Sequence, residues 1–126
     1  MAWASDEHER AARHWREALT MASQLTDKMD SAYCMRGLAT VAGARDEPRR
    51  AMRLLGAAEA LLEDAGLAYL AHETTNQLHH RVASAARERL GERAWKEARD
   101  EGRAMSFEQA VEYALGEIGA DASPFT

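Results

Sequence analysis

The sequence has little cysteine, little proline and no long apolar run, and each shortage excludes a class of structure. Cys34 is the only cysteine, so an intrachain disulfide is impossible and a reducing compartment is expected. No stretch approaches the roughly 20 apolar residues that cross a bilayer. The acidic N-terminus lacks the basic and apolar regions of a signal peptide. The sequence therefore predicts a cytoplasmic protein with no membrane partner.

Basic charge is also in short supply. The chain of 126 residues has 16 basic and 21 acidic side chains, and neither half of it has a basic excess. Nucleic-acid binding depends on lysines and arginines that neutralise phosphates. We therefore expect this segment to make no direct contact with nucleic acid.

Strong helix formers dominate what is present. Alanine, leucine, glutamate, arginine and methionine make up much of the chain, while β-branched residues are scarce. The length fits one domain with one core. The composition therefore predicts an all-α domain, which we place at residues 1–118, followed by a flexible tail or linker at residues 119–126.

Apolar residues at helical spacing predict about six helices. The first is expected from about Asp6, with Glu9 completing a capping box, and the second over residues 30–45. A third is expected to start at Pro48 and to stop at Gly66, followed by an apolar connector over residues 67–71. A fourth ends at residue 91, a short fifth surrounds residue 95, and the sixth opens with a capping box at residues 106 and 109.

An internal repeat relates the first and third expected helices at a distance of 40 residues. Small side chains on either side of a large one let neighbouring helices approach closely. The order of residues within the second unit matches that of a tetratricopeptide (TPR) unit. The spacing of 40 residues is longer than the usual TPR period of about 34, and the alternative is a chance match between alanine-rich helices. The repeat predicts TPR-like antiparallel helical hairpins in an α-α superhelix. The paired residues are Arg10, Ala11, Arg13, Trp15 and Ala18 with Arg50, Ala51, Arg53, Leu55 and Ala58.

Two longer stretches, residues 50–61 and 101–111, carry a more specific resemblance. Together with Leu90, Gly91 and Trp95 they resemble the C-terminal end of the TPR-like array in bacterial predicted ATPases and LuxR-type transcriptional regulators of the signal-transduction ATPase class. The resemblance covers roughly residues 32–118. It implies a regulatory segment of a larger protein that has an ATPase domain and sometimes a DNA-binding domain. The segment departs from that pattern at residues 66–71, where relatives have a proline-rich loop.

The first expected helix corresponds to the second helix of a repeat whose partner is missing. A half repeat implies a lost upstream sequence and an uncovered apolar face, so we expect a fragment that is able to form a homodimer through this helix. The possible protein-interaction residues are Trp3, Trp15 and Leu19. Trp15 and Leu19 also belong to the buried stripe expected for this helix, and Trp15 and Trp95 are expected as core aromatic residues. The competing arrangement is a monomer in which the last helix covers the same face.

Motifs with catalytic chemistry are incomplete. His72–Asn76 comes within one residue of the HExxH zinc motif, but Asn76 replaces the second ligand. A histidine set of His72, His79 and His80 contains no carboxylate or thiolate ligand, and such histidines are usually surface or packing residues. Cys34 has apolar neighbours that raise the pKa of its thiol. No phosphate-binding glycine loop occurs. We therefore expect no catalytic residue, metal or cofactor.

The leading functional hypothesis is a non-catalytic module that binds a protein partner or the adjacent domains of its parent protein. This role rests on the resemblance. The alternative is a sensor that binds a small apolar effector in the helical groove.

Overall fold

The computed structural model describes residues 2–71 and 77–116. Within these residues all regular structure is helical, which confirms the all-α class. One more helix is present than the sequence pattern predicts. The helices are α1 (Ala2–Gln24), α2 (Lys28–Ala44), α3 (Pro48–Asp64), α4 (Ala68–Ala71), α5 (Gln77–Leu90), α6 (Glu92–Ala104) and α7 (Phe107–Leu115).

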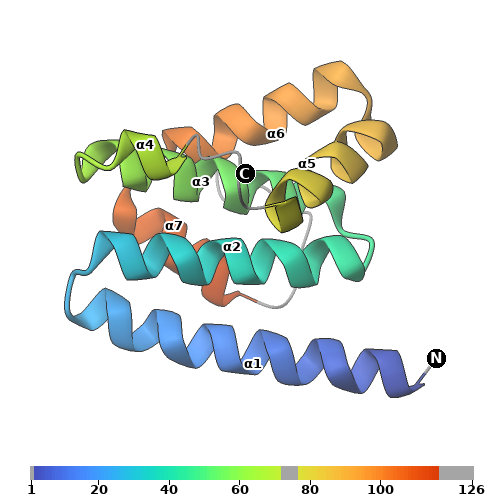
Figure 1. Cartoon of the computed structure of the whole chain (residues 1–126), viewed down its shortest axis with the longest axis horizontal. Coiled ribbons are helices and arrows are strands. Elements are labelled where there is room, and N and C mark those ends of the chain that lie inside the picture. The colour runs from blue at the N-terminus through green and yellow to red at the C-terminus, as the bar shows by residue number, and fades with distance from the viewer. Residues whose placement is uncertain (1, 72–76, 117–126) are drawn as a thin grey trace.

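The third helix is the centre of the molecule. Figure 1 shows α1 and α2 as antiparallel neighbours, with α3 between α2 and α6. Helix α3 contacts α2, α4, α5, α6 and α7, whereas α1 packs mainly against α2 and α7. This arrangement explains a difference within the predicted repeat: Arg50 and Arg53 are buried on α3, while Arg10 and Arg13 are exposed on α1.

Local signals set most helix ends as predicted. Pro48 occupies the first turn of α3, and Ser106 and Gln109 form both hydrogen bonds of a capping box at the start of α7. Gly66 and Gly91 have φ values of +80° and +84°, a backbone conformation that glycine adopts without strain. Both residues follow the ends of helices.

Two local predictions are wrong. Helix α1 begins at Ala2 rather than at Asp6, because the alanines upstream continue the helix. The predicted connector over residues 67–71 contains the short helix α4. Its last carbonyls find a donor on another helix, since Arg36 of α2 donates to the Leu70 oxygen at 2.8 Å. The sequence of the connector carries no sign of this long-range partner.

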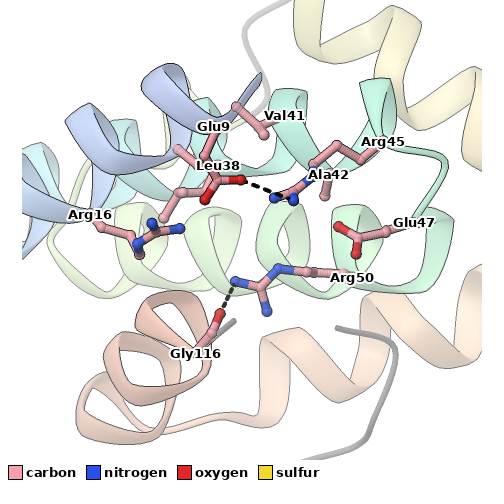
Figure 2. A pocket seen from close by; sticks show the side chains of 10 residues that line it. Glu9, Arg16, Leu38, Val41, Ala42, Arg45, Glu47, Arg50 and Gly116 are labelled. Carbon is pink, nitrogen blue, oxygen red and sulfur yellow. Dashed lines mark hydrogen bonds and ion pairs between the residues drawn. The ribbon is translucent and has the colours of Figure 1, made fainter. Parts of the chain in front are cut away.

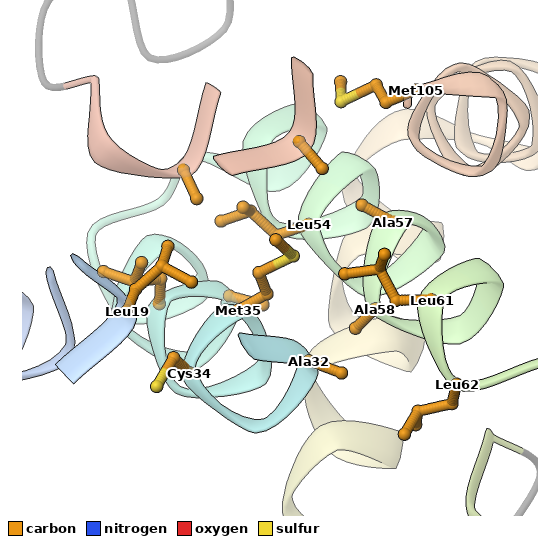
Figure 3. Close-up of a cluster of buried hydrophobic side chains, with 14 of the residues drawn as sticks. Leu19, Ala32, Cys34, Met35, Leu54, Ala57, Ala58, Leu61, Leu62 and Met105 are labelled. Carbon is orange, nitrogen blue, oxygen red and sulfur yellow. The ribbon is translucent and has the colours of Figure 1, made fainter. Parts of the chain in front are cut away.

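The core lies where α1, α2, α3 and α7 meet (Figure 3). Leu19, Met35, Leu54 and Leu62 are fully buried. Burying a side chain of this size contributes roughly 1.5–3 kcal/mol. A smaller cluster around Met52 joins α3 to α5 and α6.

Helices α3 and α6 cross at two glycines. A Cβ atom on Gly56 would lie 2.3 Å from the Arg99 carbonyl oxygen, and one on Gly102 would lie 2.0 Å from the Arg53 carbonyl oxygen. No other residue type fits at this separation. Gly56 and Gly102 therefore permit the close packing of these two helices.

Candidate functional site

The three predicted interaction residues have different surroundings. Leu19 is fully buried in the core and presents no surface to a partner. Trp15 is half-buried and packs on Gly37, where a Cβ atom would lie 2.2 Å from the indole Cε2. Trp3 lies within α1, and its side chain is outside the described part of the structure. The structure therefore does not bring the three side chains together on one open face.

Helix α7 covers part of the face of α1 that the dimer prediction requires to be open. Ala110 and Ala114 of α7 are buried in the same cluster as Leu19 and Ala12 of α1. The last helix thus folds back onto the first, as the competing arrangement requires, and the oligomeric state stays a prediction. Residues 117 and 118, the last of the predicted domain, lie outside the described residues.

Buried arginines hold helix ends in place. Arg50 donates to the carbonyl oxygens of Tyr113, Ala114 and Gly116 at 3.1, 2.9 and 2.8 Å. Arg53 donates to Glu101 at 2.9 Å. The bonds of Arg50 satisfy carbonyls that the C-terminus of α7 leaves without partners, whereas Arg53 pairs with a side-chain carboxylate of α6. Both guanidinium groups therefore have a structural role.

A small polar cavity lies beside Arg50 (Figure 2). Glu9 of α1 and Arg45 at the end of α2 form an ion pair across its rim at 3.3 Å. Its volume is about 50 Å³, which suits a few water molecules and is well below the size of organic-ligand sites. We assign it to the junction of α1, α2, α3 and the end of α7.

Cys34 is buried, and the pKa of its thiol is raised. Burial is the larger cause, and the carboxylate of Asp30 adds to it. A raised pKa keeps the group as a thiol at neutral pH, in agreement with the effect expected from its apolar neighbours. A protonated, buried thiol is a poor nucleophile.

The incomplete zinc motif at residues 72–76 lies outside the described residues. His79 and His80, which follow it, stack with their ring centres 4.8 Å apart. Across residues 2–71 and 77–116, no three His, Cys, Asp or Glu side chains are grouped so that they could hold a metal ion. In the same ranges, no helix combines the length and the apolar character that a membrane span requires.

One end of the molecule carries every exposed large apolar side chain among the residues whose burial is described. This apolar end consists of the α1–α2 turn and α4, and the ion pair between Lys28 and Asp64 joins the start of α2 to the end of α3 there. The sequence pattern did not lead us to predict this apolar end. Large apolar residues spaced i, i+4 outside the buried stripe of a helix would have indicated it. The side chains, with their exposed fractions, are Met21 (66%), Leu25 (79%), Met29 (38%), Tyr33 (39%) and Tyr69 (71%).

The second candidate is a half-open groove between α2, α3, α5 and α6. Its volume is about 440 Å³, within the usual range for small-molecule sites. Met52 and Leu55 of α3, Ala83 of α5 and Trp95 of α6 supply apolar surface. The groove exists because α3 and α6 meet closely at Gly56 while α5 packs farther along both helices.

Charged side chains line the same groove. Arg36 enters from α2, and Arg99 of α6 pairs with Glu59 of α3 at 2.5 Å. Glu59 also binds Arg103, which in turn binds Glu63 at 2.6 Å. Hydrogen bonding to Glu63 is the main cause that raises the pKa of Arg103. This network fixes α6 against α3 and places the guanidinium group of Arg99 in the wall of the groove.

Two surfaces of the described residues have the character of binding sites, the apolar end and the groove. Trp95 was predicted as a core aromatic residue, and it is half-buried with an Arg87 guanidinium 5.0 Å from its ring centre. Its position at the groove depends on the α3–α6 crossing, which no local pattern in the sequence encodes. Comparison of the chain with protein-family models, with curated proteins and with solved structures gave no match.

Proposed function

We propose that this chain is a non-catalytic, TPR-like module that binds a protein segment at its apolar end. The observation that carries the proposal is the gathering of Met21, Leu25, Met29, Tyr33 and Tyr69 at one end of the helical hairpins. Exposed large apolar side chains that gather in one region, rather than being scattered singly, mark interaction sites. Tyrosine and methionine are also enriched at such interfaces.

The charges at the apolar end favour a partner with basic flanks. Glu17 is exposed one helical turn before Met21, and Asp30 is exposed beside Met29. Asp64 is exposed at the end of α3, where it pairs with Lys28. Complementary charge speeds association and orients the partner. The partner is therefore a segment with apolar side chains between lysines or arginines, in another protein or in an adjacent domain.

Two further features support a regulatory helical array as the parent protein. The stretches at residues 50–61 and 101–111, which resemble bacterial predicted ATPases and LuxR-type regulators, meet at the crossing of Gly56 and Gly102. The charged residues at this crossing bind one another, as Arg53 does with Glu101. Because these charged groups pair with one another between two helices, they favour a structural scaffold over an enzyme.

Site-specific photo-crosslinking in the native cell tests the proposal. A photoreactive phenylalanine analogue replaces Leu25 or Tyr69 at the apolar end, and Arg93 on α6 serves as the control because its side chain is 94% exposed. We expect Leu25 and Tyr69 to give the same crosslinked protein, identified by mass spectrometry, and Arg93 to give none.

A purified segment of that protein then provides the quantitative measurement. Leu25→Ser combined with Tyr69→Ser is expected to weaken its binding by at least about tenfold, which corresponds to about 1.4 kcal/mol. Asp30→Lys should reduce the association rate and its dependence on salt. Equal affinity of the double serine variant and the native chain, or crosslinks of equal yield at Arg93, would refute the proposal.

A second candidate function is the recognition of a small effector in the groove between α2, α3, α5 and α6. The observation that favours it is the volume of about 440 Å³ beside Met52, Leu55 and Trp95. A cavity of this size with apolar walls and a few polar groups is typical of small-molecule sites. A ligand that binds the folded chain alone would raise its melting temperature.

A further inference from the structure

We propose that Met21 and Met29 form a methionine-oxidation site that controls binding at the apolar end. The inference rests on the proposed function and names a regulation of the same surface. A two-electron oxidant such as hydrogen peroxide converts both thioethers to sulfoxides, and the partner is released. Three observations carry the inference: the exposure of these two methionines, the burial of the other described methionines, and the place of each exposed sulfur beside an apolar neighbour.

The methionines of this chain differ widely in exposure. Met21 is 66% exposed near the end of α1, and Met29 is 38% exposed at the start of α2. Met35, Met52 and Met105 are 0%, 2% and 8% exposed. An oxidant in solution has to touch the sulfur in order to react with it. Among the methionines whose burial is described, the oxidant therefore reaches the two at the apolar end first.

Each exposed methionine has an apolar neighbour four residues farther along the chain. The Leu25 N–H donates to the Met21 carbonyl oxygen at 3.3 Å, so the helical turn continues from Met21 to Leu25. Met29 and Tyr33 have the same spacing within α2. Side chains at this spacing lie on one face of a helix. Because α1 and α2 are antiparallel neighbours joined at this end (Figure 1), both pairs belong to the surface that the partner contacts.

The reaction adds one oxygen atom to each thioether. The sulfur lone pair attacks one oxygen of the peroxide, so an S–O bond forms as the O–O bond breaks. The departing hydroxide takes the proton of the transferred oxygen and becomes water. Sulfur loses two electrons, and the peroxide gains them. The sulfoxide is polar and has to lose its bound water before an apolar partner can cover it, so the oxidised site opposes docking.

Oxidation at this site leaves the core unchanged. Met35 and Met52 belong to the two buried clusters, whereas Met21 and Met29 belong to neither. Cys34 is buried and its pKa is raised, so little thiolate competes for the oxidant. Methionine sulfoxide reductases restore the thioether, which makes the change reversible. The chain therefore stays folded while its binding surface changes, as a switch requires.

Peptide mass spectrometry of the native, folded chain tests the site. The chain is treated with hydrogen peroxide, catalase stops the reaction, and the sulfoxide at each methionine is quantified over time. We expect Met21 and Met29 to oxidise at least about tenfold faster than Met35 and Met52. In urea, where every sulfur is accessible, the rates should converge.

Two double variants test the effect on binding to the protein segment that crosslinking identifies. Met21→Gln with Met29→Gln imitates the polar sulfoxide, so it should weaken binding by at least about tenfold without any oxidant. Met21→Leu with Met29→Leu keeps the apolar surface and removes the sulfurs, so it should bind like the native chain before and after peroxide. The oxidised native chain should bind as weakly as the glutamine variant and recover after treatment with methionine sulfoxide reductases. Circular dichroism verifies that each chain is folded.

The outcomes separate the switch from the proposed function. If the segment binds the oxidised chain as tightly as the reduced chain, or if the leucine variant also loses binding after peroxide, the apolar end still binds and the methionine switch is overturned. Equal oxidation rates at exposed and buried methionines of the folded chain would also overturn it. If Leu25 and Tyr69 give no crosslinked protein, or if Leu25→Ser with Tyr69→Ser binds as tightly as the native chain, the proposed function fails and the switch fails with it.

Discussion

Arg50 of α3 holds Tyr113 of α7 in two ways. Its guanidinium donates to the Tyr113 carbonyl oxygen at 3.1 Å, and its Cζ lies 5.1 Å from the centre of the tyrosine ring. The same group also binds the carbonyls of Ala114 and Gly116. A cation at this position stabilises the negative end of the helix dipole. One buried side chain therefore fastens the C-terminal end of α7 to the centre of the molecule.

Arg50→Met should release α7 from the bundle. Buried carbonyl oxygens lose their donor, so we expect the free energy of unfolding to fall by about 1–3 kcal/mol, measured in urea. Because α7 covers the face of α1 that contains Leu19, the variant should also self-associate in sedimentation equilibrium. Arg93→Met removes a 94% exposed side chain and should change neither quantity.

The native chain in the same sedimentation experiment tests the homodimer prediction. A monomer mass at about 100 μM, together with protection of Trp15 from a quencher, would contradict that prediction and favour the bundle closed by α7. If native chain and Arg50→Met have equal mass and equal stability, the role assigned to Arg50 is wrong.

Gly102→Ala should separate α3 from α6. The added Cβ atom would lie 2.0 Å from the Arg53 carbonyl oxygen, and backbone is unable to move aside cheaply. We expect a loss of about 1–3 kcal/mol in the free energy of unfolding, despite the higher helix propensity of alanine. Gly43→Ala is the matched control, since its nearest neighbour is the Val82 side chain at 3.2 Å. Similar urea midpoints for the two variants would show that the crossing tolerates a methyl group.

Ala51→Leu tests the small position that the repeat predicts. Ala51 is fully buried on α3, so a larger side chain should overpack the helix contacts at a cost of about 1–3 kcal/mol. Lys96→Ala on the exposed side of α6 should change stability by less than about 0.5 kcal/mol. Thermal and urea unfolding followed by circular dichroism give both values. An Ala51→Leu chain as stable as the Lys96→Ala chain would refute the assignment of a close contact.

Cys34 should react slowly with a thiol reagent in the folded chain. Its pKa is raised by burial and by Asp30, so little thiolate is present at pH 8, and we expect at least about a hundredfold slower labelling than in urea. Because the folded-state pKa lies above the unfolded value of 9.0, the linked stability is present below pH 9 and is lost as the pH rises further. Asp30→Asn should lower the pKa and speed labelling, and unchanged labelling would exclude the electrostatic contribution.

Local chemistry in the sequence determined the class of fold and many helix ends. Pro48 starts α3, Ser106 with Gln109 starts α7, and Gly66 follows the end of α3. Each of these signals acts within a few residues through a fixed φ angle or a hydrogen bond to a nearby amide. Helix-favouring composition and apolar spacing therefore sufficed to predict an all-α chain. The same composition extended α1 to Ala2, ahead of the predicted cap at Asp6.

Tertiary structure alone decided the environments of residues with similar sequence patterns. Arg10 and Arg50 occupy equivalent repeat positions, yet Arg10 is exposed on an outer helix and Arg50 is buried beneath α7. Leu19 belongs both to the predicted buried stripe of the first helix and to the possible interaction residues, and it is covered because α7 returns to α1. The groove at Trp95 likewise forms only when α3, α5 and α6 are assembled. Helix formation depends on near neighbours in the chain, so the sequence pattern predicts it. Burial and pocket shape depend on contacts between residues distant in the chain, so the sequence pattern does not predict them.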